Sequence, residues 1–412
     1  MNKIIGLAIA AAFGLSACSN LDHKTAHEVM SISNDRILKE DHSFNITGSS
    51  RVYISPLAEA VLADEKVEEK AKTEDAKAKA EDAAASMEAT QEEDDPLKQE
   101  FSEQEEAEFR NAMLDALPDG TIAQVAINYL DKYPAISSYI ERTHLNYEVA
   151  VDLSTRQFEM IPELAINNHN EKLSIKLPMK LDAEKWEIYM DPPASAAAII
   201  SVYTDEKIGK RLIKEPLKLS LKEIGDSKRM PFDHIAEAGV RAFLSANKAM
   251  PADAYVFKEM DAFGKANHAR YRVRHVMKPE YDSVVMKAMA KAFDEELSKL
   301  QKTPQPGSTE EDYKNAREFF SMSVNISDNQ PLSFQRIFGN NLVVDYYLDR
   351  KGRMLASRMY MQINGTHKAI NIIGDSVYSN YGKPVFKLNP QGKGITWEEL
   401  KEFFSSNKKE DD

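Results

Sequence analysis

Apolar and polar residues alternate along several stretches of this chain, and a period of two predicts β-strands with one buried face. The alternation is clear from Tyr147 onward, and Pro178 on the polar side of one run indicates a strand edge or a bulge. Runs with one apolar side are typical of an antiparallel sheet. The strands predicted in this way cover residues 147–153, 173–181, 186–190, 255–260, 270–277, 320–326, 341–348, 353–363, 368–373 and 384–388.

A period of three to four residues predicts helices between these strands. Asp233 is a candidate N-cap for one helix, and Asp282 or Ser283 for another. Thr396 and Glu399 form a capping box before the last helix. The predicted helices cover residues 122–133, 194–203, 232–247, 283–300 and 397–405.

The alternation and the helices together predict an α+β fold, with curved antiparallel sheet units packed against amphipathic helices. We expect residues 109–304 to form a first α+β part, and residues 305–412 a second, β-rich part that packs against it. A loop at residues 305–308 separates the two parts. Gly352 supplies the positive φ of a hairpin turn in the second part.

The composition changes sharply before this folded body. Apolar residues make up 42% of the 412 residues, enough for a core, and the formal net charge is −13. Residues 64–108 hold 18 acidic and 6 basic side chains, so their net charge of −12 accounts for nearly all of the total. The remaining body is almost neutral, which gives no reason to expect a nucleic-acid partner.

Residues 64–108 also lack an apolar stripe, which predicts a disordered or single-helix acidic linker. The alternative is an acidic arm that binds a basic partner. Residues 18–63 are polar with little periodicity, and we expect a solvated N-terminal stalk with one brief strand at residues 51–54.

The first residues have the composition of an export signal. Lys3 precedes an apolar run over residues 4–15, which at 12 residues is shorter than the ~20 that span a membrane. A Leu-Ser-Ala-Cys sequence follows and ends at Cys18. It resembles the lipobox of bacterial lipoproteins, although the resemblance covers only this N-terminus. The resemblance implies that residues 1–17 are removed and that Cys18 carries acyl chains such as palmitate.

Cys18 is the only cysteine, so the chain has no second thiol for a disulfide. Ser19, rather than Asp, follows it, which resembles the lipoproteins that Gram-negative bacteria deliver to the outer membrane. The resemblance therefore implies an outer-membrane anchor with the body facing the periplasm. An ordinary cleaved signal peptide is the alternative. Stable attachment needs more than one acyl chain.

Motifs for covalent catalysis are weak. Ser245 and Lys248 fit the Ser-x-x-Lys pattern of penicillin-binding enzymes, and residues 327–329 fit their Ser-Asp-Asn pattern. The Lys-Ser/Thr-Gly motif of these enzymes has no match, and Ser245 falls at the end of a predicted helix instead of its start. We therefore expect no catalytic residue.

Metal motifs are incomplete as well. His23 and His27 have the i, i+4 spacing of a zinc site, but Lys24 stands where the glutamate of zinc proteases is needed. Residues 389–400 lack the carboxylates of a calcium loop. His275, on the apolar side of its strand, is expected to be a half-buried histidine with satisfied hydrogen bonds. We expect no metal and no cofactor.

Two further features bear on binding. Arg270, Arg272 and Arg274 share one side of a predicted strand, where a solvated sheet face is favoured over a site for an anionic headgroup or glycan. Methionines are frequent on the predicted apolar strand faces, and methionine packs adaptably against varied apolar partners. These methionines are Met160, Met179, Met190, Met277, Met322, Met359 and Met361.

The sequence thus favours a non-enzymatic binding or envelope-assembly lipoprotein, including a carrier of lipid or another apolar ligand. Its expected partners are the membrane, through the lipid anchor, and an apolar ligand or an envelope protein. A scaffolding lipoprotein with a solid methionine-rich core is the first alternative. An envelope hydrolase with an unrecognised site is the second.

Overall fold

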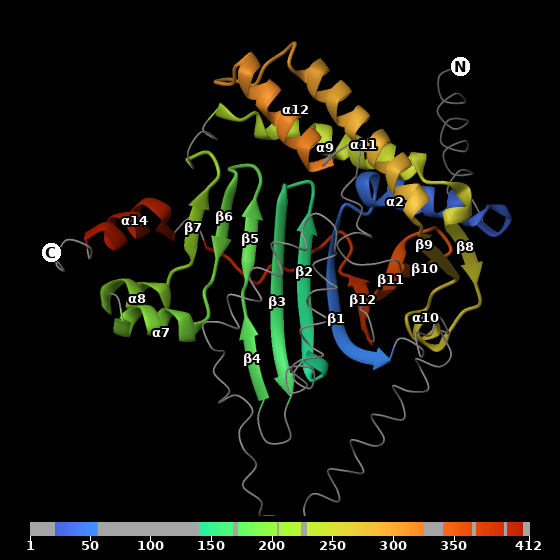
Figure 1. Cartoon of the computed structure of the whole chain (residues 1–412), viewed down its shortest axis with the longest axis horizontal. Helices are drawn as coiled ribbons and strands as arrows, with labels where there is room; N and C mark the ends of the chain where they lie inside the picture. The colour runs from blue at the N-terminus through green and yellow to red at the C-terminus, as the bar shows by residue number, and fades with distance from the viewer. Residues whose placement is uncertain are drawn as a thin grey trace, which may run out of the picture.

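The computed structural model describes residues 21–56, 140–167, 172–203, 206–223, 229–324, 341–364, 368–390 and 394–406. Cys18, the acidic linker, the helix expected at residues 122–133 and the Ser-Asp-Asn sequence at residues 327–329 lie outside these ranges. Within them the α+β class is confirmed, since helices accompany a large, mostly antiparallel sheet (Figure 1).

The described strands form one sheet of 13 strands, in the order β13-β7-β6-β5-β3-β2-β1-β12-β11-β10-β9-β8, with β4 paired to β3. Neighbouring strands are antiparallel, except that β13 pairs with β7 in parallel. The strands are β1 Ser43–Pro56, β2 Thr143–Asp152, β3 Gln157–Asn167, β4 Lys172–Lys176, β5 Met179–Asp182, β6 Glu187–Met190, β7 Leu217–Ser220, β8 Tyr255–Lys258, β9 Tyr271–Met277, β10 Asn341–Leu348, β11 Met354–Asn364, β12 Lys368–Ser379 and β13 Ile395–Thr396.

The helices gather at two places around the sheet. Figure 1 shows α9, α11 and α12 together beyond the ends of the strands, and α7, α8 and α14 near β7. A core of Ala238, Phe293, Leu297 and Tyr313 joins the first group. The helices are α2 Ala26–Lys39, α7 Ala194–Tyr203, α8 Glu206–Leu212, α9 Phe232–Ala249, α10 Ala262–Ala266, α11 Pro279–Leu300, α12 Glu310–Val324 and α14 Trp397–Ser406, with 3-10 turns at Leu21–His23 and Ala252–Ala254.

The solvated stalk expected at residues 18–63 is wrong for its described part, residues 21–56. Thr25 and Glu28 form a capping box that begins α2, and Val29 and Met30 are buried against the sheet. β1 then runs between β2 and β12, far longer than the brief strand expected at residues 51–54. Gly48 and Ser50 interrupt the apolar side of β1, which conceals its period of two in the sequence, and pairing with β2 and β12 stabilises the strand.

The strand expected at residues 320–326 is also wrong for its described part, because α12 continues through residues 320–324. Thr309 and Asp312 cap this helix reciprocally, since each backbone N–H donates to the other's side chain. Tyr313 and Phe320 then fall on one face, and Phe320 stacks on Phe293 of α11 with ring centroids 3.7 Å apart. The residues spaced at the helical period pack against α11, whereas no neighbouring strand in the described ranges is available to pair with these residues as a strand.

Two helix starts differ from the prediction. Asp233 is not an N-cap, because Pro231 occupies that position, and the Asp233 carboxylate instead accepts from Arg156 Nη1 at 2.8 Å. α11 begins at Pro279, before Asp282 and Ser283, since proline fits the first turn of a helix without losing a backbone hydrogen bond.

Two strand predictions need correction as well. The run at residues 173–181 is divided into β4 and β5 beside Pro178, where the prediction placed an edge or bulge. Residues 384–388 form no strand and have no partner strand within the described chain. The predicted turn is confirmed, with Gly352 at φ 80°, and so is the capping box of Thr396 and Glu399.

Candidate functional site

The register of the sheet defines two faces with opposite chemistry, because directly opposed residues of paired strands point to the same side. One row of opposed residues crosses the sheet from β9 to β4, and every member is polar. From β9 the row reads Arg274, Asp345, Arg358, Asp375, Ser49, Asn146, Glu163 and Lys176. We call this side of the sheet the charged face.

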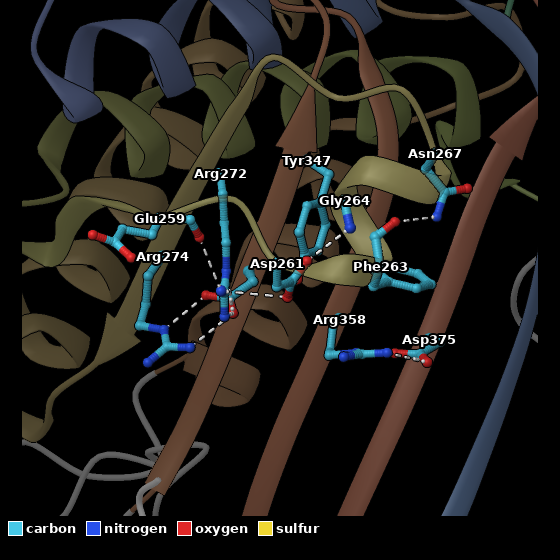
Figure 2. Close-up of polar contacts among 11 residues, drawn as sticks. Glu259, Asp261, Phe263, Gly264, Asn267, Arg272, Arg274, Tyr347, Arg358 and Asp375 are labelled. Carbon is cyan, nitrogen blue, oxygen red and sulfur yellow. Dashed lines mark hydrogen bonds and ion pairs between the residues drawn. The ribbon is translucent and has the colours of Figure 1, made fainter. Parts of the chain in front are cut away.

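Asp345 is the centre of the charged face, and its side chain is 0% exposed. Arg272 donates to its carboxylate through Nε at 3.1 Å and Nη2 at 2.6 Å. Arg274 donates through Nε at 2.7 Å and Nη2 at 2.8 Å, as Figure 2 shows. The solvated face predicted for these arginines is therefore wrong, because their guanidinium groups are committed to a buried carboxylate.

The helix α10 lies on the charged face beside this cluster. Asp261, its N-cap, accepts from the N–H of Gly264 and from the hydroxyl of Tyr347, each at 2.7 Å (Figure 2). Burial and the hydrogen bond to Asp261 raise the pKa of Tyr347. Gly264 contacts the Tyr347 ring so closely that a Cβ added to Gly264 would lie 2.6 Å from Tyr347 Cδ1. The fit locks α10 over β10.

The next ion pair of the row joins Arg358 and Asp375, with Nε 2.6 Å from Oδ1. The Arg358 guanidinium lies over the ring of Phe263 in α10, with its Cζ 4.4 Å from the centroid of that ring. Burial alone would lower the pKa of Arg358, but the hydrogen bonds and the charge of Asp375 raise it. The charged side chains in this part of the face are therefore paired with one another and are not available to bind a ligand.

A hollow of about 350 Å³ lies on the charged face over β1, β2, β3, β4 and β12. Glu148, Glu163, Lys176 and Asp375 contribute to its lining. The pKa of Glu163 is lowered, chiefly by a hydrogen bond from Ser174. A glycosidase-type acid needs a carboxyl with a raised pKa, so Glu163 does not suit that role. The four charged side chains of the lining also do not fit an acyl chain.

The segment at residues 384–388 covers another part of the charged face. Its backbone N–H groups at Lys387 and Leu388 donate to the buried carboxylate of Glu159, at 2.9 Å and 2.6 Å. These hydrogen bonds satisfy backbone groups of the segment that have no partner strand.

The opposite side of the sheet is the methionine face. Met160 of β3 opposes Met179 of β5, which in turn opposes Met190 of β6. Met359 and Met361 of β11 alternate with Arg358 and therefore lie on the same side. The structure thus gathers five of the seven predicted methionines on one face. Met277 is in β9, and Met322 lies in α12 instead of a strand.

The two ends of the methionine face differ in their cover. At the β8 to β12 end, α2 packs against it with Val29 and Met30, near Tyr346 and Tyr378. Around β2, β3 and β4, large apolar side chains of this face remain 39–55% exposed. They are Leu145, Phe158, Leu164, Leu173 and Ile175. An exposed group of this kind is typical of a binding surface.

A close packing of Tyr147 and Gly48 separates these two ends. The Tyr147 ring lies over Gly48, so that a Cβ there would be 2.2 Å from Tyr147 Cζ. The Tyr147 hydroxyl reaches across β1 to the hydroxyl of Ser376 on β12, at 2.6 Å. Glycine is required here by the close approach of a side chain.

His275, also on the methionine face, is more buried than predicted. Its ring lies 4.8 Å from that of Tyr255, and its Nε2 has no hydrogen-bond partner among the described residues. The expected satisfied hydrogen bonds are therefore incomplete. Burial lowers the pKa of His275 to about 4, so the ring is neutral near pH 7.

The remaining sequence candidates do not form a site. His27 Nε2 lies 3.1 Å from the carbonyl oxygen of Met250, and no group of three metal-ligating side chains occurs within the described ranges. Ser245 lies in the last turns of α9, away from a helix start. The structure does not describe Cys18. Across the described helices, none has both the length and the apolar character needed to cross a bilayer.

No protein-family model, curated protein or solved structure matches this chain. The functional argument therefore depends on the two faces of the sheet. Sequence reasoning identified most of the methionine face but missed Asp345. The sequence did mark this position, since Asp345 is the only charged residue among the otherwise apolar or aromatic residues 342–348.

Proposed function

We propose that this protein is an outer-membrane lipoprotein, anchored through Cys18 with its body facing the periplasm. It acts as a non-enzymatic binding or envelope-assembly factor whose methionine face receives an apolar ligand such as an acyl chain. The observation that carries the proposal is the gathering of five methionines and several exposed leucine-sized side chains on one side of one sheet. Flexible thioether side chains adapt to ligands of varied shape. In this proposal the sheet curves around the ligand.

The contrast between the two faces supports this assignment. The charged face is occupied by α10, by the 384–388 segment and by its own ion pairs. Three carboxylates and one lysine line its hollow, so an acyl chain placed there would remove these charges from water. The methionine face has the opposite balance, since covering its exposed apolar side chains removes them from water.

The binding test compares two matched double variants on the same strands. Leu164 opposes Ile175 on the methionine face, and Glu163 opposes Lys176 on the charged face. Leu164 and Ile175 are each 42% exposed, so a ligand that covers both gains about 2 kcal/mol, or roughly 30-fold in affinity. The Leu164→Gln/Ile175→Gln variant should lose this factor, whereas Glu163→Gln/Lys176→Gln should bind as the wild type does.

The measurement is native mass spectrometry of the purified protein, followed by titration with a fluorescent fatty acid. A co-purifying mass that disappears on denaturation identifies the ligand class. A bare protein mass together with no fatty-acid uptake would reject the carrier and leave the scaffolding lipoprotein in its place. The anchor is tested separately by labelling cells with a palmitate analogue, which should mark the wild-type chain and not Cys18→Ala.

A further inference from the structure

A basic concavity lies on a part of the molecule that neither face of the sheet explains. It has a volume of about 1000 Å³ and lies between the end of α2, residues 268–270 and the turn that joins β10 to β11. Five arginine and lysine side chains line it, against two acidic ones. The basic residues are Arg36, Arg270, Arg350, Lys351 and Arg353.

Three of these cations have partners within the protein. Asp41 accepts from both Arg36 and Arg353, at 3.0 Å and 2.8 Å. Arg270 lies 3.7 Å from the carboxylate of Asp22. These pairs neutralise most of the charge at the inner side of the concavity. The Asp41 pairs tie α2 to the turn between β10 and β11, and the Arg270 pair ties the N-terminal turn to the start of β9.

Arg350 and Lys351 are different, because both are exposed and neither side chain has an ion-pair partner among the described residues. Their turn is rigid. Asp349 Oδ1 accepts the backbone N–H groups of Lys351 and Arg353, at 2.7 Å and 2.9 Å. The carboxylate nearest in sequence is thus occupied by the backbone, which leaves two adjacent cations at the tip of a fixed turn.

The N-terminal chain is attached beside this tip. Leu21 is buried in the core, and its Cδ1 lies 3.3 Å from the Cβ position of Gly352. Cys18 precedes Leu21 by three residues, which span at most about 10 Å. An acyl chain on Cys18 therefore enters its bilayer within about 10 Å of Leu21, which contacts the turn. The exposed cations of that turn are therefore held near the bilayer, whose surface charge acts over a Debye length of about 8–10 Å at physiological salt.

We propose that the turn with Arg350 and Lys351 binds the anionic headgroups of the bilayer into which Cys18 is inserted. The inference rests on the proposed lipid anchor and extends it, since the protein is then held at two points. A lipid gives attachment without a fixed orientation, whereas a rigid basic turn beside it sets which side of the body meets the membrane. A basic patch next to an acyl chain is a combination that strengthens membrane attachment.

The test uses the chain from Ser19 to Asp412, which retains every described residue and lacks the lipid. Its binding is measured by co-sedimentation with vesicles of phosphatidylcholine mixed with phosphatidylglycerol, and with vesicles of phosphatidylcholine alone. Each Lys or Arg near an anionic surface contributes about fivefold. Arg350→Gln/Lys351→Gln should therefore weaken binding to the anionic vesicles by roughly 30-fold, and added salt should do the same to the wild type.

A matched control removes two other exposed lysines, Lys287 of α11 and Lys302 after it, both outside the concavity. Lys287→Gln/Lys302→Gln should bind as the wild type does. Equal binding by the two double variants would overturn the proposal, and so would equal binding to anionic and neutral vesicles. Competition by inorganic phosphate at low concentration would assign the turn to a free anion instead.

The vesicle experiment does not depend on lipidation or on the methionine face. Failure of palmitate labelling with intact vesicle binding would reject the anchor alone. Labelling of Cys18 without vesicle binding by the turn would reject only the present inference.

Discussion

Replacing Asp345 by asparagine should destabilise the protein more than any other single loss of charge on the charged face. The substitution keeps the shape of the side chain but removes the charge that two buried arginines share. Arg272 and Arg274 are 7% and 13% exposed and make four hydrogen bonds to the carboxylate. Asparagine offers one acceptor oxygen, and its amide nitrogen would face a guanidinium.

The magnitude follows from the cost of leaving buried charge without a partner. Removing one partner of a buried ion pair typically costs about 3–5 kcal/mol. A domain of a few hundred residues loses about 2–4 °C in Tm for each kcal/mol, so Asp345→Asn should melt roughly 6–20 °C lower. Asp375→Asn is the control. Asp375 is 32% exposed and its partner Arg358 keeps its contact with Phe263, so we expect about 1–2 kcal/mol.

The assay is thermal and urea unfolding of the chain from Ser19, followed by circular dichroism. A triple variant, Asp345→Leu with Arg272→Met and Arg274→Leu, should recover most of the lost stability, because apolar residues can replace a buried ionic cluster at little cost. A Tm for Asp345→Asn within about 1 °C of the wild type would refute this account of the charged face.

Two further predictions concern the methionine face. Gly48→Ala should cost about 1–3 kcal/mol in urea unfolding, and less than half as much in a Tyr147→Val background, because the added Cβ meets the Tyr147 ring at 2.2 Å. Equal costs in both backgrounds would contradict the close packing. The pKa of His275 is lowered from 6.5 in the unfolded chain to about 4 in the folded protein. As the pH falls from about 6.5 toward 4, the unfolded chain takes up a proton at His275 that the folded protein does not, and the free energy of unfolding decreases. The loss should reach about 2 kcal/mol between about pH 7 and pH 5, and His275→Gln should remove it.

Local patterns predicted the elements that have one apolar side. β10 and α7 have the predicted bounds, and the turn at Gly352 has the predicted backbone conformation. In each case the signal is contained within a few consecutive residues. The same locality explains the false strand at residues 320–324, where alternation and helical spacing coexist and packing against Phe293 of α11 favours the helix.

The two faces of the sheet required information that no local pattern holds. Each methionine was assigned to an apolar strand side from its neighbours. Whether these sides coincide depends on strand order and register, and a shift of one residue would have moved Met160 to the face of Glu163. β1 was missed for a different reason, since Gly48 and Ser50 interrupt the apolar side that Phe44, Ile46, Val52 and Ile54 would otherwise make continuous.

The place of β1 in the sheet also determines when the fold can be completed. Its two neighbours are β2 and β12, and Ser55 of β1 bonds to Asn371 of β12, 316 residues further along the chain. Pairing of such distant segments is slow, because a long loop must close before the contact forms. A chain emerging from a ribosome or an export channel therefore carries the free edge of β1 until its last quarter has appeared. During that interval the unpaired edge of β1 can pair with a strand of another chain, so we expect aggregation during folding to begin at β1 unless this edge is covered.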